Sequence, residues 1–232
     1  EIRLSLVGSE MCIRDRVYRA GIKIGVLTPD HILLFIGVYI LLTGVYMLYY
    51  PNFTSLTTMI RDGKLDMYLV KPVAAQFLVT MQRLDLSLLV PDAAAGIVMI
   101  GIGWHWAGLP VTVGSIAGFL FFLICGALLT YSLFLLPHLL VFWTTATNGI
   151  ADLTAAVWDF NNMPQLIYGK WMQRIGTFLL PVFVITNFPG LFLMGELSAP
   201  MAVWGVAAPI VFFLIARAVW NQAVKNYTSA ST

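Results

Sequence analysis

Ionisable residues inside apolar stretches are the first candidates for chemistry in this chain. Asp92 lies in such a stretch, and Asp85 precedes it by seven residues, or two helical turns, so that both carboxylates would share one helix face. An ionisable group within a membrane is costly and is usually retained for function. Asp92 is therefore a candidate contact for a cationic substrate or ion, whereas Asp85 could simply pair with Arg83 or Lys71.

His138 is the second ionisable group of this kind, and it follows Pro137. Its ring could relay protons. The simpler explanation is a hydrogen bond to a backbone carbonyl that the proline leaves without a donor.

The sequence contains no arrangement of residues that indicates catalysis. The zinc-protease pattern HExxH, the hydrolase pattern GxSxG and the phosphate-binding pattern GxxxxGK[ST] do not occur, and Cys12 and Cys125 lack metal-ligand spacing. We therefore expect no catalytic residue, no metal site and no cofactor bound by this chain.

The composition indicates an integral membrane protein. Hydrophobic residues make up 59% of the chain and charged residues 10%, with a mean hydropathy of +0.86. Soluble domains carry about 25% charged residues, so the bilayer must be the solvent for much of this surface. A net charge of +2 without any basic run argues against a nucleic-acid partner.

Apolar stretches long enough to cross a membrane predict an all-α, polytopic transmembrane bundle. The five predicted spans are residues 32–50, 86–106, 113–141, 175–193 and 201–220. Pro51 and Asn52 are expected to end the first span, and the small residues 93–96 to let two helices approach, most simply within one subunit.

Lys and Arg alternate between the connections and predict which of them are cytoplasmic. They occur after the first, third and fifth spans, which places the C-terminus in the cytoplasm. With five spans the N-terminus would be external, and Arg19 and Lys23 would have to cross the membrane. An even number of spans would remove this difficulty.

Two long cytoplasmic segments follow from this arrangement, residues 57–86 and 144–174. In the first we expect a short helix, a turn at Gly63 and an interfacial segment. In the second, Ile150, Leu153 and Val157 have helical spacing and predict an interfacial helix that ends before Asn161. From composition alone, residues 57–86 could be a connector on the headgroups or a docking element for a cytoplasmic partner.

Several stretches resemble the permease subunits of type-2 ATP-binding-cassette exporters, the ABC-2 family transporter proteins. They are "IRDGKLDMYLVKP" with "RLDLSLL", then "FWTTATNGIADL", "YGKWMQRIGTFLLPVFVITNFPGLFL" and the terminal "VWNQAVKNYTSAST". The resemblance implies six spans in the intact protein, both ends in the cytoplasm, and a bacterial inner membrane. It also implies a second permease subunit, identical or related, and cytoplasmic ABC ATPases that use ATP and Mg²⁺.

The resemblance assigns the contact with the ATPase to one segment. The residues carried over by position are Ile60, Arg61, Asp62, Gly63, Lys64, Leu65 and Asp66.

The beginning of the chain does not fit the family pattern. Residues 1–16 resemble translated read-through of a sequencing adapter, so we hypothesise that they are not native. Residues 17–232 would then form a single permease domain whose first family span is missing.

The sequence thus predicts a subunit that exports a hydrophobic or amphipathic substrate by alternating access, driven by a partner ATPase. The rival hypothesis is an ATP-independent secondary transporter or a membrane assembly factor. A secondary carrier usually has internal repeats and an ionisable residue at mid-depth. We find no repeat, and Asp92 is the only serious candidate for that coupling residue.

Overall fold

Every regular element that the structure describes is a helix, which confirms the predicted all-α fold. The structure is a computed structural model that describes residues 28–144 and 148–227. The larger helices are α2 (Pro29–Arg61), α5 (Leu86–Trp106), α6 (Val113–Leu139), α7 (Asn148–Asp159), α9 (Val182–Leu193) and α10 (Ala199–Asn226). The short elements are α3 (Asp66–Leu69), α4 (Ala75–Thr80), α8 (Lys170–Arg174), the 3₁₀ turns η1 (Leu140–Phe142), η2 (Phe160–Asn162) and η3 (Gln165–Ile167), and the π segment η4 (Ile175–Leu179). The stretch predicted to be non-native, residues 1–16, lies outside the described residues.

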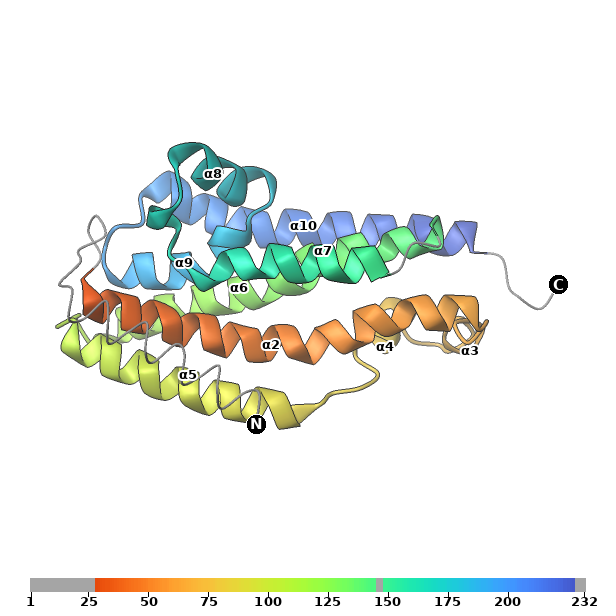
Figure 1. Cartoon of the computed structure of the whole chain (residues 1–232), viewed down its shortest axis with the longest axis horizontal. Helices are drawn as coiled ribbons and strands as arrows, with labels where there is room; N and C mark the ends of the chain where they lie inside the picture. The colour runs from red at the N-terminus through yellow and green to blue at the C-terminus, as the bar shows by residue number, and fades with distance from the viewer. Residues whose placement is uncertain (1–27, 145–147, 228–232) are drawn as a thin grey trace.

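The long helices lie along a common axis, as Figure 1 shows. Helix α2 packs on α5, and α6 packs on both α9 and α10. The turns at residues 107–112 and 194–198 lie at one end of the bundle, which we call the α9 end. Helix α3 and the last turns of α10 lie at the opposite end, the α3 end.

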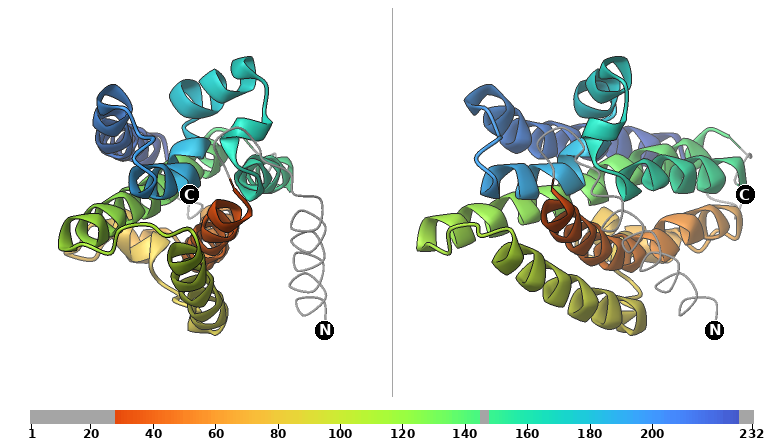
Figure 2. Two further views of the ribbon diagram at one scale, coloured as in Figure 1. Left: turned by 90° about the vertical axis from the view of Figure 1, so that its left-hand side faces the viewer. Right: turned by 60° about the vertical axis from the view of Figure 1, so that its left-hand side comes forward.

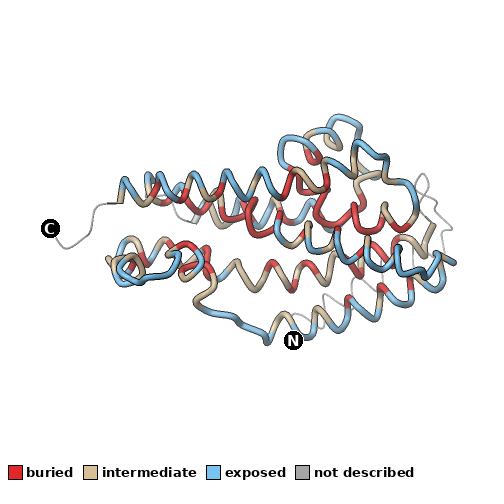
Figure 3. Tube along the Cα trace, turned by 180° about the vertical axis from the view of Figure 1, so that it is seen from behind, coloured by how far each residue is buried: buried red, intermediate tan, exposed pale blue. Residues whose placement is uncertain are grey.

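Within the residues that the structure describes, four helices are long and apolar enough to cross a membrane. They are α2, α5, α6 with η1, and α10, and there are five spans if the bent pair formed by α8–η4 and α9 counts as one. The outer surface of α5 is apolar, with Val90, Ile97 and Val98 each about three-fifths exposed, as membrane lipid requires. Figure 3 shows the buried residues gathered between the helices and the exposed ones along the outer side of the bundle.

Glycines bring the backbones of α2 and α5 into contact. A Cβ on Gly96 would lie 2.8 Å from the carbonyl oxygen of Gly37, and a Cβ on Gly103 would lie 2.7 Å from the backbone nitrogen of Leu34. Such close approach is typical of helix pairs in membranes. The small residue Gly96 therefore serves packing within the subunit, as expected.

Helix α2 is longer than the sequence predicts, because Pro51 does not end it. The helix continues without a break to Arg61. A proline removes only one backbone donor, and neighbouring polar groups can compensate. The carbonyl that Pro51 leaves without its helical donor is that of Met47. Next to it, the Asn52 side chain donates to the Leu48 carbonyl at 3.3 Å, and the Thr54 hydroxyl donates to the Tyr50 carbonyl at 3.2 Å.

The predicted span at residues 175–193 is wrong as a single straight helix. Helix α8 continues as η4, and the chain then bends by 100° before α9. Pro181 lies at the bend and holds Leu180 in an extended conformation, with φ −120° and ψ 84°. Helix α9 has 12 residues, about 18 Å, and is too short to cross the ~30 Å hydrocarbon core alone.

Helix α7 occurs where the spacing predicts a helix, but it does not lie across the end of the spans. The Trp158 ring stacks on Tyr46 at 4.3 Å between centroids, and Tyr39 lies 6.2 Å away. The Tyr50 hydroxyl donates to the Ala151 carbonyl at 3.4 Å. Helix α7 therefore runs antiparallel to α2 and alongside it, within the depth of the first predicted span.

Helix α8 projects from the side of the bundle, as Figure 2 shows. The adjoining η4 is fixed to the beginning of α10, where Trp204 Nε1 donates to the Thr177 carbonyl at 2.7 Å. Lys225 lies 21 residues after Trp204, about 32 Å along the helix axis. Lys170 and Arg174 therefore do not share a bundle end with Lys225, although the sequence placed all three on the cytoplasmic side; the side of the membrane on which α8 lies stays a prediction.

Candidate functional site

The segment assigned to the ATPase begins with a sharp turn at the end of α2. The Asp62 backbone N–H donates to the Thr58 carbonyl at 2.9 Å, and the Gly63 N–H donates to Ile60 at 3.2 Å. Gly63 has a φ of +68°, in the left-handed region that favours glycine. The predicted turn at Gly63 is confirmed, and it directs the chain back toward α2.

The seven assigned residues differ in what they offer a partner. Arg61, Asp62 and Lys64 are exposed, and Lys64 Nζ pairs with Asp62 Oδ2 at 2.7 Å. This pair is solvated, so it adds little stability and leaves both side chains accessible. Leu65 is fully buried and cannot touch a partner.

Exposed apolar side chains follow immediately, and the sequence reasoning missed them. Met67 is 60% exposed and Val70 83%, and their spacing of three places them on one face of α3 and its last turn. Val73 follows at 52%. We call these three residues the apolar tip. Exposed apolar residues grouped beside charged ones typically mark a contact with another protein or with the membrane surface.

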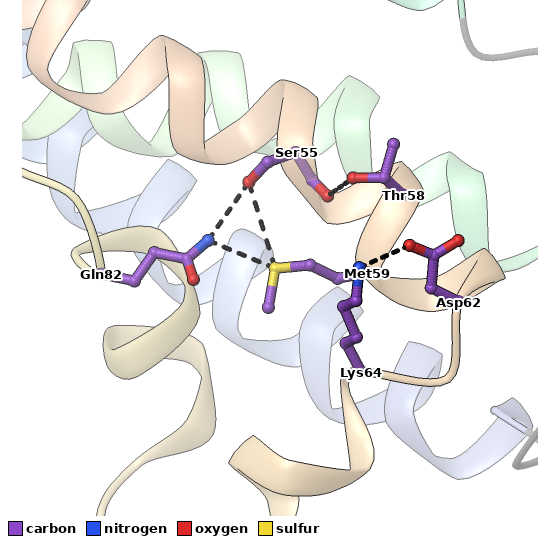
Figure 4. A network of polar contacts seen from close by, with 6 residues as sticks. All are labelled: Ser55, Thr58, Met59, Asp62, Lys64 and Gln82. Carbon is purple, nitrogen blue, oxygen red and sulfur yellow. Dashed lines mark hydrogen bonds and ion pairs between the residues drawn. The ribbon is translucent and has the colours of Figure 1, made fainter.

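The segment between α2 and α5 is held against α2 by side-chain hydrogen bonds. Figure 4 shows Gln82 donating to the Ser55 hydroxyl and to the Met59 sulfur, each at 3.2 Å. The Tyr68 hydroxyl donates to the Gln82 side-chain oxygen at 2.8 Å, which ties α3 to the same group. These hydrogen bonds therefore hold α3, and with it the apolar tip, in a fixed position against α2.

Asn52 supplies a second attachment, one residue further along the same segment. Its side chain is 1% exposed, donates to the Arg83 carbonyl at 2.8 Å, and accepts from the Arg83 N–H at 3.2 Å. Because both backbone groups of Arg83 are engaged, the segment is held close to α2 where it turns toward α5. The predicted role of Asn52 as a helix terminator is thus replaced by a role in tertiary structure.

The end of α10 also meets this site. Burial raises the pKa of the Tyr227 hydroxyl above its ordinary value, and the nearby Asp66 carboxylate raises it further. Tyr227 is therefore neutral at physiological pH. Asp66 of α3 therefore lies close to Tyr227, the residue that follows α10.

The two aspartates singled out by the sequence have different surroundings on α5. Asp85 is the N-cap of α5 and accepts from the Ser87 N–H at 3.0 Å and from its hydroxyl at 2.6 Å. These hydrogen bonds lower the pKa of Asp85. Asp92 lies further along α5, half-buried, with its Cβ 3.0 Å from the position a Cβ on Gly44 would occupy. Its suggested contact with a substrate or ion stays a prediction.

His138 bonds a backbone carbonyl, but not the one that the simpler explanation named. Its side chain is 1% exposed, and Nδ1 lies 2.8 Å from the Phe134 oxygen. The partner carbonyl requires a proton on Nδ1. The carbonyl is that of Phe134, one residue away from the Leu133 carbonyl that Pro137 leaves without its helical donor.

Asp159 lies at the level of the first predicted span, although the sequence reasoning placed it outside the spans. Its neighbour Trp158 stacks on Tyr46, in the middle of α2, while Asp159 itself is exposed. A charged group at this depth normally faces water or another protein, because lipid would not solvate it. Only the tertiary contact of α7 with α2 reveals the level at which Asp159 lies, because the local sequence is typical of an interfacial helix.

Comparison with known proteins identifies the family. The model of the ABC-2 family transporter proteins matches residues 15–231. No curated protein and no solved structure matches the chain at a significant level. Members of this family are membrane components of transporters, and the family implies association with an ABC ATPase. With a match over nearly its whole length and four to five candidate spans, the chain belongs to the ABC-2 family of membrane transporter proteins.

Proposed function

We propose that this protein is the permease subunit of an ATP-driven exporter and that its α3 end binds a cytoplasmic ABC ATPase. The observation that carries the proposal is the apolar tip, which is exposed and belongs to a segment that is hydrogen-bonded to α2. Met67, Val70 and Val73 supply the apolar contact, and Arg61 and Lys64 flank it with positive charge. A buried apolar centre with a charged rim is the usual composition of a protein interface.

In this proposal the partner ATPase hydrolyses ATP. The chain has no phosphate-binding loop, so ATP and Mg²⁺ would be bound by the ATPase. This assignment makes the α3 end and the C-terminus cytoplasmic. The cations Arg61, Lys64 and Lys225 at that end agree with the positive-inside rule.

A second permease subunit, identical or related, completes the proposed transporter. The exposed Asp159 on α7 supports this part, because a polar path between two subunits would solvate the carboxylate at mid-depth. The same path suits an amphipathic substrate, whose polar group could approach Asp159 while its apolar part lies against the helices. Such a substrate is pumped by alternating access only if its affinity differs between the two states.

The test compares two exposed valines at opposite ends of the bundle. Val70 lies in the apolar tip, and Val111 lies in the turn at the α9 end, where it is 73% exposed. The permease is reconstituted in lipid nanodiscs with its candidate ABC ATPase, and the dissociation constant of the ATPase is measured. We expect Val70→Asp to weaken binding at least tenfold, because a buried, unpaired carboxylate opposes the interface.

The control Val111→Asp should bind the ATPase like the wild type. Equal affinities for both variants would show that the apolar tip does not contact the ATPase. Absence of ATPase binding by the wild type would refute the exporter assignment itself.

A further inference from the structure

Helix α4 carries a polar face into the bundle, although it belongs to the connecting segment. Gln76 is 3% exposed and Thr80 1% exposed, whereas Phe77 on the other side is 58% exposed. Buried polar side chains in a short connecting helix need partners, and the two side-chain partners here, Tyr131 and Arg217, lie on different long helices.

Four side-chain groups form a continuous chain of hydrogen bonds. Arg217 of α10 donates to the Gln76 side-chain oxygen at 3.1 Å, and the Gln76 amide nitrogen donates to the Tyr131 hydroxyl of α6 at 3.2 Å. Thr80 donates its proton to the Gln76 backbone carbonyl at 2.8 Å, so the Tyr131 hydroxyl must be the donor in its 3.1 Å contact with Thr80. In this network, which we call the α4 joint, the hydroxyls of Thr80 and Tyr131 then each have an acceptor.

Tyr131 extends the α4 joint to the remaining helices. Its ring packs edge-on against Tyr49 and Phe53 of α2, at 5.5 and 5.7 Å, and lies 6.3 Å from Phe213 of α10. Helices α2, α4, α6 and α10 therefore meet at one side chain. Arg217 here contacts a neutral amide, which can align the guanidinium group but carries no charge to pair with it.

The arrangement resists sliding of α4 over the bundle. Movement of α4 relative to α6 or α10 would leave Gln76, Thr80 and Tyr131 buried without their partners, which is unfavourable. Movement of α4 together with those helices leaves every contact intact. A displacement applied at the α3 end is therefore passed on to α6 and α10 through this network.

We propose that Gln76 and Tyr131 are positioning residues that transmit movement of the ATPase-binding segment to α6 and α10. The inference rests on the proposed function, since it needs an ATPase at the α3 end. It assigns a role to residues that touch neither the apolar tip nor Asp159.

The test follows α10 directly during the ATPase cycle. Spin labels are placed at Val203 of α10 and Val98 of α5, which are exposed at 69% and 58%, in a background in which Cys12 and Cys125 are serine. The distance between the labels is measured by pulsed electron resonance in nanodiscs, with the ATPase bound, before and after trapping with Mg·ATP and vanadate. Binding of the ATPase is measured on the same samples.

We expect Gln76→Leu and Tyr131→Phe to reduce the vanadate-dependent shift at least twofold while ATPase binding changes less than twofold. Tyr131→Phe removes only the hydroxyl and keeps the ring contacts, so it separates transmission from folding. The control is Gln173→Leu on α8, which removes a comparable hydrogen bond, 2.8 Å to the Tyr168 carbonyl, away from the α4 joint. This variant should keep the full shift.

A full shift in both α4-joint variants would overturn the inference, and so would an equal loss in Gln173→Leu. A wild-type transporter that binds no ATPase, or that shows no vanadate-dependent shift, would refute the proposed function and the transmission role with it. The two failures are therefore distinguished by the wild-type sample.

Discussion

The contact between α2 and α5 predicts a measurable difference between two glycines on the same helix. A Cβ on Gly96 would lie 2.8 Å from the Gly37 oxygen and from the Leu41 Cβ, whereas a Cβ on Gly101 would have no atom within 4 Å. Since ordinary contacts begin near 3.4 Å, Gly96→Ala must separate the two backbones by about 0.6 Å, the difference between 3.4 and 2.8 Å. Overpacking of this kind costs roughly 1–3 kcal/mol.

Both substitutions gain helix propensity, roughly 0.5–1 kcal/mol for alanine over glycine. This gain cancels when the two variants are compared, so Gly96→Ala should be about 1–3 kcal/mol less stable than Gly101→Ala. The assay is reversible unfolding in mixed micelles as the fraction of denaturing detergent rises, followed by tryptophan fluorescence. Equal midpoints for the two variants would refute the backbone contact between α2 and α5.

Two further predictions concern the attachment of Arg83 to Asn52 and the proposed polar path along α7. Asn52→Leu removes both hydrogen bonds to the Arg83 backbone, so limited trypsin digestion should cleave after Arg83 several times faster than in the wild type; an unchanged rate would contradict the anchoring role. In the cysteine-free background, Asp159→Cys should react with a membrane-impermeant thiol reagent at least tenfold faster than Val98→Cys, because water reaches Asp159 and lipid covers Val98. Similar rates would contradict a polar path along α7.

The sequence predicted those helices whose ends are set by local signals. The predicted span 86–106 coincides with α5, whose beginning is capped by Asp85 and whose end precedes Gly108, a glycine with φ +63°. Helix α2 was predicted too short, because its continuation beyond Pro51 depends on Asn52 and on contacts with a segment more than 30 residues away. Local patterns do not contain such contacts.

The path from α7 to α9 could not be predicted for a related reason. Lys170 and Arg174 have the composition of a cytoplasmic connection, but η4 is held by Trp204 near the beginning of α10. Pro181 was recognised as unusual in a span, yet whether a proline kinks a helix or ends it depends on its neighbours in space. The same limit applies to Asp159, whose depth follows from the stacking of Trp158 on Tyr46.

The length of α2 determines how a force at the α3 end could reach the membrane. Its 33 residues span about 50 Å, and the hydrocarbon core is ~30 Å thick, so a substantial part of the helix stands outside. The ATPase-binding segment is attached to that outer part through Asn52 and Gln82, and the helix has no break between it and the glycine contacts with α5.

Under the proposed function, a push at the apolar tip would therefore tilt α2 and α5 together. Through Gln76 and Tyr131 the same push would reach α6 and α10. Both pairs of long helices are connected to one segment by short, buried contacts. Alternating access in this protein would then arise from rigid-body movement of these two helix pairs relative to each other, with little bending of single helices, which is the kind of transition that closely packed interiors permit.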